Sequence, residues 1–435
     1  MIHDFMLALN IKKEDIILIP FFFHFLFFTV IFFLVNGLRI PVLANRELID
    51  KIYYTEYFFI LVLVSIISLS QILKVRKIHL SHIHERILFC FVPLTLLAAI
   101  IGLLNQNSIR YIINDSISLL YLPLLYFLLN SYYYHGIAKE FMRKLYYMFL
   151  FLALLDFCMQ LFFFVNGRVV ITNSIFYLFP LLYLLFLEKR SLREYLIMSL
   201  LFISAILTFK RTLWVVLIFI LFCYFIYSFF YKKKKIQLVT VFILPLILSV
   251  FVFFIFPNQV KYAVVRITQT TNSFSNIYTL ENSIARRMIE NYALINIAKS
   301  SDLGTILFGR GLGSELNLAD SYLPSRYYMA AGDSKFLIHS IHGTPQTFFF
   351  RTGILGLFLF LMFSFFLFKM LWRLAFKFKY LKKYSIALFF FFLIHISFSV
   401  TAYIFWFDIW FLIFFLATGW LLRDYDYQLK NNETL

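Results

Sequence analysis

Charged residues are scarce in this sequence. Asp, Glu, Lys and Arg make up 14% of the 435 residues, whereas soluble globular domains carry about 25%. Apolar residues make up 62%, and the mean hydropathy is +0.84. This composition excludes a soluble globular domain and indicates an integral membrane protein. Its backbone groups must then be satisfied within helices, because the bilayer core offers no water.

Cysteine is also rare, and internal repeats are absent. Cys90, Cys158 and Cys223 lie far apart within apolar runs, so they match neither a metal-ligand spacing nor a disulfide framework. We interpret them as small core residues. The absence of a repeat argues against transporter folds that are built from two related halves.

Long apolar runs dominate the chain. They predict an all-α polytopic membrane protein with about twelve transmembrane helices. The first run leads into Asn36 and Gly37 without a small-residue cleavage site, so we expect a first helix rather than a signal peptide. The runs are 16–35, 55–73, 87–104, 112–130, 145–166, 171–187, 195–209, 212–230, 236–256, 346–368, 384–402 and 405–422.

The basic residues predict the orientation. The net charge is +18, but Lys and Arg sit in short segments between apolar runs, not on an aromatic-interleaved face, so nucleic acid is not an expected partner. With the N-terminus inside, the cytoplasmic segments hold 24 Lys and Arg and the short outside loops hold 7. Both termini are therefore expected in the cytoplasm.

One long hydrophilic stretch interrupts the apolar runs. It divides the chain into helices 1–9 at 1–256, an extracytoplasmic loop at 257–345, and helices 10–12 with a tail at 346–435. Within the loop, 282–298 carries apolar residues at helical spacing, which predicts a helix on the bundle or the membrane surface. The apolar positions are Ile284, Met288, Tyr292 and Ile295.

Two arginine motifs could bind an anionic ligand. Lys210 and Arg211 stand between two apolar runs on the outer side, where positive residues are disfavoured, and a guanidinium binds phosphate oxygens bidentately. The alternative is a snorkelling pair that sets helix depth. Arg286 and Arg287 open the predicted loop helix. Their alternative is a surface pair between Arg286 and Glu290 at i, i+4.

A glycine-alternating segment follows the loop helix. In Gly309-Arg310-Gly311-Leu312-Gly313, exposed backbone N–H groups could form an anion nest. The alternative is a tight structural turn. The segment is not a dinucleotide fingerprint, because the third glycine spacing and a βαβ pattern are missing.

Two histidines precede the tenth apolar run. Either His339 or His342 could accept a proton from a sugar hydroxyl, because histidine titrates near neutral pH. The alternatives are an inert loop histidine and a metal pair, for which no cysteine or carboxylate completes a ligand set.

Charged and titratable residues within the apolar runs are functional candidates because burial in lipid is costly. They are Asp156, Arg351, His395 and Asp408. For Asp156 the alternative is structural pairing with a basic residue of a neighbouring helix, and Arg351 and Asp408 lie near helix ends, where they could reach water.

The order of these motifs resembles the superfamily of O-antigen ligases and O-antigen polymerases. The shared order is arginine after a mid-chain span, a loop helix opened by arginine, a glycine-rich turn, and histidine before a span with Gly353-Ile354-Leu355-Gly356. It covers about 205–360. His342 is followed by Gly343 where ligases commonly have Asn, and Arg351 stands where many members carry an acidic residue, which favours a polymerase over a ligase.

The resemblance implies a membrane-embedded glycosyltransferase of the bacterial inner membrane. Its donor and acceptor would be oligosaccharides on undecaprenyl diphosphate, with no cofactor or metal and with a separate chain-length regulator as a possible partner. Arg211 with Arg286 or Arg287 would stabilise the diphosphate leaving group, helped by Lys210 and Arg310. His342, or His339 in its place, would orient or deprotonate the acceptor hydroxyl.

Two other functions remain open at this point. A ligase would transfer the glycan to lipid A-core or another acceptor. A flippase of the same lipid-linked glycan would also need many spans, but it predicts charge at the membrane midplane. Here the polar residues concentrate on the outer side and in one loop, which favours the enzyme.

Overall fold

The computed structural model of the protein is mostly helical. The residues that it describes are 82–130, 133–165, 175–187, 191–207, 217–222, 224–225, 282–325, 327–328, 337–339, 341, 343–377, 381–399 and 409–430, with the single residues 18, 19, 22, 26, 265 and 268. The predicted runs 55–73 and 236–256 lie outside these residues, and 16–35 and 212–230 lie largely outside them.

The described helices of the apolar bundle coincide with predicted runs. Three stretches, Ile83–Leu104, Ile137–Phe162 and Thr344–Lys377, are long and apolar enough to cross a membrane by length and composition. The described part is therefore mostly helical with three candidate spans, which fits the predicted all-α membrane class. The helices are α4 (Ile83–Leu104), α5 (Ile109–Asn130), α6 (Ile137–Val165), α7 (Ile175–Leu185), α8 (Leu192–Leu207), α15 (Thr344–Lys377), α16 (Lys382–Ser399) and α17 (Ile409–Lys430).

Aromatic side chains fill the core of this bundle. Phe91 of α4 contacts Phe348 and Phe363 of α15 edge-on, with ring centroids 5.7 and 6.5 Å apart. Trp420 of α17 is fully buried and packs 4.9 Å from the ring of Phe141. Cys90 and Cys158 are exposed on the bundle surface, so their interpretation as core residues was wrong. Each lies on the outward face of its helix.

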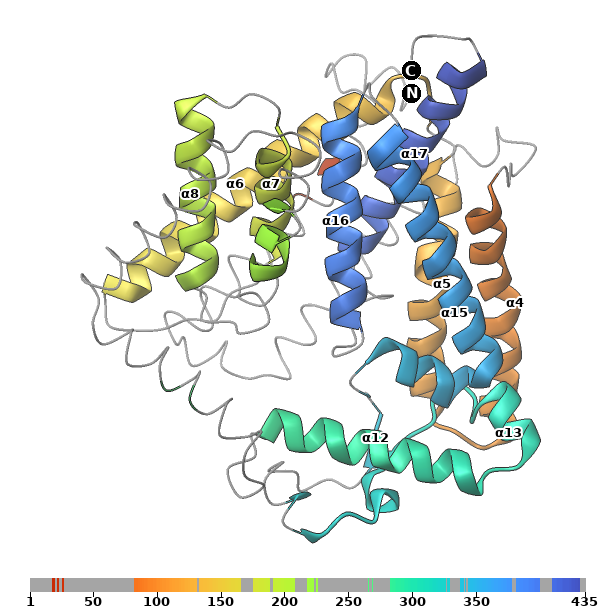
Figure 1. The fold of residues 1–435 in the computed structure, drawn as a ribbon. Helices are drawn as coiled ribbons and strands as arrows, with labels where there is room; N and C mark the ends of the chain where they lie inside the picture. The colour runs from red at the N-terminus through yellow and green to blue at the C-terminus, as the bar shows by residue number, and fades with distance from the viewer. Residues whose placement is uncertain are drawn as a thin grey trace.

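Helix α15 is broken where the sequence has Gly353. This glycine has φ 66° and ψ −163°, which is not helical. A Cβ there would meet the backbone of Leu307 and Phe308, so the bend lets the loop approach closely. In Figure 1 the first turns of α15 lie across the end of the bundle, and the remainder runs along it. The predicted straight span at 346–368 is therefore two segments.

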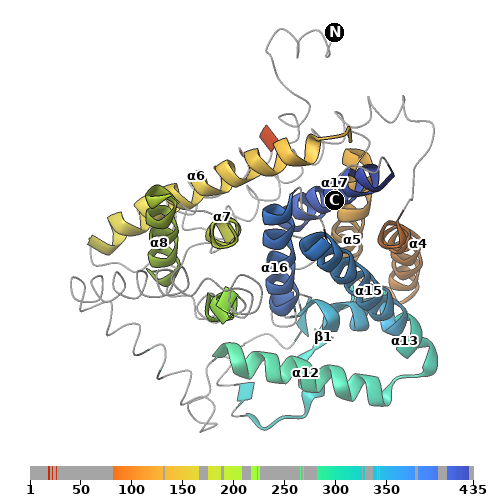
Figure 2. The same ribbon diagram turned by 45° about the horizontal axis from the view of Figure 1, so that its top comes forward.

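The described part of the loop forms a small layer with its own core at one end of the bundle. Its elements are α12 (Asn282–Ser300), α13 (Leu303–Phe308), β1 (Leu316–Asn317), η4 (Leu318–Ser321) and β2 (Leu337–Ile338). β1 and β2 are antiparallel, with Leu316 opposite Ile338. Figures 1 and 2 both show α12 lying crosswise to α15. Phe350 of α15 is buried in this second core, which fastens the loop to the bundle.

The predicted helix in the loop is confirmed, but its buried face differs from the predicted one. Tyr292 and Ile295, of the predicted apolar stripe, are 46% and 50% exposed. The buried stripe is Ala285, Ile289 and Ala293, with Ile297 continuing it at i+4. Small alanines let the helix approach β1 and η4 closely, and Asn296 donates to the carbonyls of Asp320 (3.0 Å) and Ser321 (3.2 Å).

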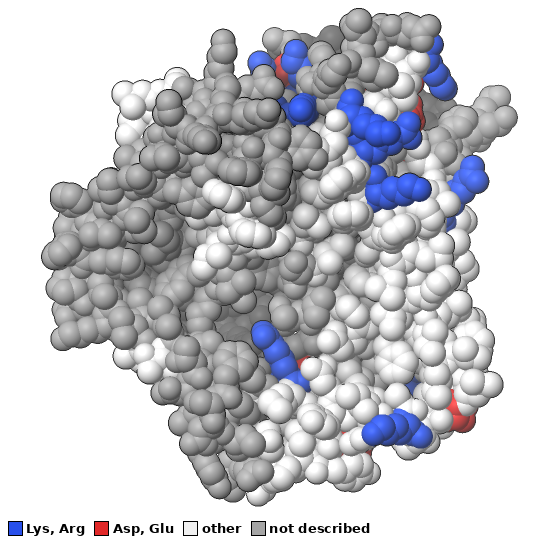
Figure 3. Space-filling view, viewed as in Figure 1, with Lys and Arg blue, Asp and Glu red and all other residues white. Residues whose placement is uncertain are grey.

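The opposite end of the bundle carries most of the visible basic side chains. In Figure 3 they gather at the end away from α12. Buried polar contacts tie the helix ends together there. Glu85 of α4 is fully buried, accepts a 2.8 Å hydrogen bond from the hydroxyl of Tyr126, and lies 3.6 Å from the guanidinium of Arg423 of α17. The two ends of the bundle are thus chemically distinct.

Candidate functional site

A buried carboxylate joins the bundle to the loop. Asp115, one turn and a half into α5, is 2% exposed. Its Oδ1 lies 2.5 Å from Nη1 of Arg351 in α15, and its Oδ2 accepts a 2.8 Å hydrogen bond from the backbone N–H of Gly313. Arg351 is itself 3% exposed. Two opposite charges therefore compensate each other where α5, α15 and the loop meet.

His339 completes this cluster from the end of β2. Its Nε2 lies 3.2 Å from Oδ1 of Asp115, and its backbone carbonyl accepts a 2.8 Å hydrogen bond from Arg351. The ring stacks on Tyr111, which lies one turn before Asp115 on α5, with centroids 4.0 Å apart and 12° between the planes. Position and orientation of the imidazole are therefore fixed by three residues of the bundle.

The contacts of His339 bear on its tautomer. Nε2 can donate to Asp115, or it can accept from Nη2 of Arg351 at 3.3 Å, but it cannot do both. Nδ1 is buried and has no hydrogen-bond partner among the described residues. In the tautomer that donates from Nε2 to Asp115, Nδ1 carries a lone pair and can accept a proton.

The glycine-alternating segment is a tight structural turn. Glycines 309, 311 and 313 have φ of 77°, 82° and 77°. The N–H groups of Arg310, Gly311 and Leu312 donate to the carbonyls of Phe350 (2.9 Å), Arg351 (3.1 Å) and Ala98 (2.9 Å), and Gly313 donates to Asp115. These donors are engaged within the protein, so they are not free to bind an external anion. Of the two alternatives, the tight structural turn is confirmed, and the segment contacts α4, α5 and α15.

The two arginines that open α12 have different surroundings. Nε of Arg286 lies 3.2 Å from Oε1 of Glu290, whose side chain is 1% exposed. The predicted i, i+4 pair is confirmed, although Glu290 is buried rather than on the surface. Nε of Arg287 is buried and has no hydrogen-bond partner among the described residues. Of the two arginines, Arg287 is therefore the one with an N–H donor that has no partner among the described residues.

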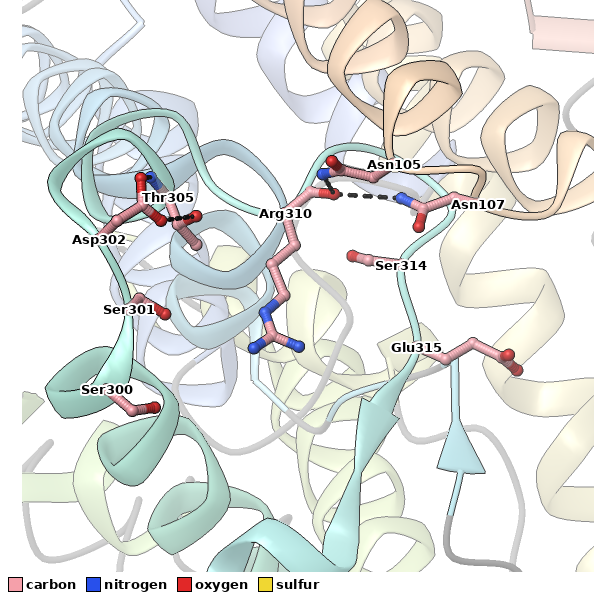
Figure 4. Close-up of a pocket in the computed structure, with 9 residues that line it drawn as sticks. All are labelled: Asn105, Asn107, Ser300, Ser301, Asp302, Thr305, Arg310, Ser314 and Glu315. Atoms are coloured by element: carbon pink, nitrogen blue, oxygen red, sulfur yellow. Dashed lines mark hydrogen bonds between the residues drawn. The ribbon is translucent and has the colours of Figure 1, made fainter.

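Arg310 projects into an open polar pocket of about 660 Å³. Asn105 and Asn107, in the connection between α4 and α5, each donate a 3.1 Å hydrogen bond to its backbone carbonyl. Its guanidinium lies 5.9 Å from the centroid of the Phe350 ring. In Figure 4 the guanidinium lies between Ser301 on one side of the pocket and Ser314 on the other. The Glu315 carboxylate points away from it. The other lining residues are Ser300, Ser301, Asp302, Thr305 and Ser314.

Not every predicted site residue can be placed. His342, Lys210 and Arg211 lie outside the described residues, as does Asp408. The structure brings His339 together with Arg351, and it places Arg310 on the turn that bonds to both Arg351 and Asp115. Metal binding has no candidate within the described part of the chain, where no group of three His, Cys, Asp or Glu could hold an ion.

Buried polar residues of the other helices have local partners. The Asp156 carboxylate accepts hydrogen bonds from the Tyr177 hydroxyl of α7 and from Gln160, at 3.0 Å for the latter. The sequence predicted a basic partner from a neighbouring helix, whereas these two donors are neutral. His395 of α16 is 3% exposed and stacks on Phe391, with centroids 6.1 Å apart.

Asp115 was missed by the sequence reasoning. A usable signal existed, because Asp115 is an acidic residue inside the apolar run 112–130, and Arg351 is a basic residue at the start of another. Isolated opposite charges in apolar runs are expected to pair. The spacing of these charged residues in the sequence did not predict which acidic residue would pair with which basic residue.

The chain matches no family model, no curated protein and no solved structure.

Proposed function

We propose that this protein is a bacterial inner-membrane polymerase of lipid-linked oligosaccharide repeat units, of the O-antigen or capsule type. The observation that carries the proposal is the arrangement at His339. A carboxylate orients one imidazole nitrogen, and the other has no partner among the described residues, at the junction between an apolar bundle and a polar loop. Such a junction suits a substrate whose polyprenyl chain is apolar and whose glycan is polar.

The proposed topology has about twelve spans, with both termini in the cytoplasm and the 257–345 loop outside. Two observations support it. Most of the basic side chains visible in Figure 3 gather at the bundle end away from α12, as the positive-inside rule expects for a cytoplasmic end. The connection between α4 and α5 bonds to the loop through Asn105 and Asn107, so both belong to one side of the membrane.

The proposed reaction transfers a glycan from undecaprenyl diphosphate to a hydroxyl of a second lipid-linked glycan. The acceptor oxygen forms a bond to the anomeric carbon, and the bond from that carbon to the phosphate oxygen breaks. The diphosphate leaves with the electron pair, and the hydroxyl proton passes to a histidine. In the tautomer that donates from Nε2 to Asp115, His339 Nδ1 has the lone pair for this step, and His342 is the second candidate.

Cations near the leaving group would stabilise the charge that develops on it. Arg287 is the best-supported candidate for this role, because its buried Nε has no partner among the described residues. Arg286 is held by Glu290, which fixes its guanidinium in place. Lys210 and Arg211 remain candidates from the sequence. Arg310 lies in a pocket of its own.

The length profile of the cell-surface polysaccharide tests this proposal. Cells that lack the chain would be complemented with wild type, His339→Gln, His342→Ala, Arg211→Ala or Arg287→Gln. Glutamine at position 339 keeps a donor for Asp115 but removes Nδ1, so it separates proton transfer from structural support. We expect wild type to restore the ladder and His339→Gln to leave single repeat units. Lys299→Gln, at an exposed site on α12, is the charge-loss control.

Other outcomes assign other functions. Full-length chains that stay on the carrier lipid would indicate the ligase. Repeat units that never reach the outer face would indicate a flippase. A ladder that is unchanged in cells lacking the chain would contradict the polymerase.

A further inference from the structure

The pocket around Arg310 offers a cation that the protein does not neutralise. Among the described residues the guanidinium makes no ion pair, and its contact is the Phe350 ring at 5.9 Å. The backbone of Arg310 is hydrogen-bonded on both sides. Its N–H donates to the carbonyl of Phe350, and its own carbonyl accepts from the side chains of Asn105 and Asn107. The backbone of Arg310 is therefore held in place, and Figure 4 shows its guanidinium directed into the pocket.

A second polar group in the pocket also lacks a partner. Ser314 is 4% exposed, and its Oγ has no hydrogen-bond partner among the described residues. In Figure 4 this hydroxyl faces the space beside Arg310. Leaving a buried hydroxyl unpaired costs about 1–3 kcal/mol, so a ligand that bonds to Ser314 would recover that energy.

The remaining lining residues are suited to hydroxyl groups. Ser300, Ser301 and Thr305 provide hydroxyls, and the two asparagines provide amides, so the wall holds both donors and acceptors. Asp302 accepts from the backbone N–H groups of Gly304 and Thr305 and from the Thr305 hydroxyl. The Thr305 hydroxyl and these backbone groups lower the pKa of Asp302, which is therefore a carboxylate at neutral pH.

These features distinguish between anionic ligands. A diphosphate carries several negative charges, which the single guanidinium would neutralise only in part, and Asp302 adds a carboxylate to the same lining. A single carboxylate on a sugar matches the single unpaired guanidinium, and its hydroxyls can donate to Asp302 and the asparagine oxygens. The volume lies within the usual range for small-molecule sites, about 300–1,000 Å³.

We infer that the Arg310 pocket is a binding subsite for a sugar that carries a carboxylate. Arg310 binds the carboxylate, and Ser314 with the hydroxyl and amide side chains binds the ring hydroxyls. The inference deepens the proposed function and rests on it for its biological meaning, since the acidic sugar would belong to the repeat unit. Gly313, next to Ser314, bonds to Asp115, so the subsite adjoins the His339 cluster.

Ligand binding to the purified full chain tests this inference without requiring polymerase activity. The protein would be placed in phosphatidylcholine nanodiscs and titrated with methyl glucuronide, methyl galacturonide, methyl glucoside and inorganic phosphate, with saturation-transfer NMR as the readout. We expect saturable binding of at least one uronide. Arg310→Gln should weaken it about tenfold, as loss of a charge-assisted contact does. Arg310→Lys should give an intermediate value, because the planar fork is lost but the charge is kept.

Matched controls separate the site from general electrostatics. Lys299→Gln removes the same charge from the neighbouring turn without lining the pocket, and it should bind uronides as wild type does. Equal uronide binding in Arg310→Gln and wild type, or no saturable uronide binding, would overturn the inference. So would phosphate that binds as tightly as the uronides, or loss of uronide binding in phosphatidylglycerol nanodiscs, since these outcomes indicate a phosphate or lipid-headgroup site. A ladder unaffected by loss of the chain, with Arg310-dependent uronide binding, would refute the polymerase and leave the subsite standing.

Discussion

At the scale of single residues, the ion pair between Asp115 and Arg351 is the most consequential contact at the candidate site. Both side chains are almost fully buried, at 2% and 3% exposed. Removing two charges from solvent costs several kcal/mol per ion, and their attraction with good hydrogen bonds offsets that cost. The pair therefore adds little net stability while intact, but either charge left alone is strongly unfavourable.

This asymmetry predicts the behaviour of single and double variants. Arg351→Gln should lower the free energy of unfolding by about 3–5 kcal/mol, because Asp115 loses its charged partner. The Asp115→Asn, Arg351→Gln double variant should lose less than the sum of the single changes. Chemical unfolding of the detergent-solubilised protein gives the three values. Additive losses would show that the two side chains do not interact.

An exposed ion pair provides the control for this cycle. Arg143 lies 2.7 Å from Glu140, and their side chains are 56% and 30% exposed. Arg143→Gln should cost less than about 1 kcal/mol, because water screens the exposed pair.

At the scale of secondary structure, the glycine-alternating turn decides how α4, α5 and α15 fit together. A Cβ at Gly311 would meet the backbone of Gly102 and Ile101 in α4, and one at Gly309 would meet the backbone of Arg351 and Thr352. Helix axes are stiff, so these contacts cannot be relieved by one side chain moving. The sequence pattern predicted a tight turn as one alternative, but not which helices it contacts.

Gly311→Ala should therefore lower the free energy of unfolding by more than the cost of placing alanine at a positive φ. The positive φ costs alanine roughly 1–2 kcal/mol, and displacement of α4 adds to this. Gly136→Ala is the matched control, since Gly136 has φ 87° and nothing lies within 4 Å of its added Cβ. Thermal unfolding of both variants in detergent compares the two effects. Equal losses would mean that close packing at Gly311 contributes nothing.

At the scale of the whole molecule, the loop and the basic side chains visible in Figure 3 lie largely at opposite ends of the bundle. At one end, polar contacts around Glu85, Arg423 and Asp424 connect the helices. There the Tyr133 hydroxyl donates a 2.8 Å hydrogen bond to Asp424. At the other end, the loop core and the contacts of Asp115 with Arg351 and His339 connect the loop to the bundle. The proposed topology follows from this division and is open to direct measurement.

Cysteine labelling in intact cells tests the topology. In a background without the three native cysteines, Tyr322→Cys should react with a membrane-impermeant maleimide from outside, because Tyr322 is 81% exposed on the loop. Lys430→Cys, at the end of α17, should react after the inner membrane is permeabilised. Reversed labelling would contradict the proposed orientation, and labelling of both sites from one side would contradict the assignment of the two ends to opposite faces.

The sequence by itself determined the mostly helical membrane class and the approximate positions of the described bundle helices. Apolar length is sufficient for this, because a helix in lipid satisfies its own backbone groups and needs no partner to be recognised. The helix at 282–300 was also predictable, although its buried face was not, since alanines that permit close approach do not stand out as an apolar stripe.

Only the tertiary structure decided what meets at the candidate site. Asp115 and Arg351 are 236 positions apart, and the N–H groups of the glycine-alternating turn pair with α4, α5 and α15. Local patterns carry no information about such contacts, because helix packing sets them through the fit of surfaces distant in the sequence. His339 could be nominated from its residue type, but its partners and its unpaired nitrogen follow from the packing of α5 against α15 and the loop.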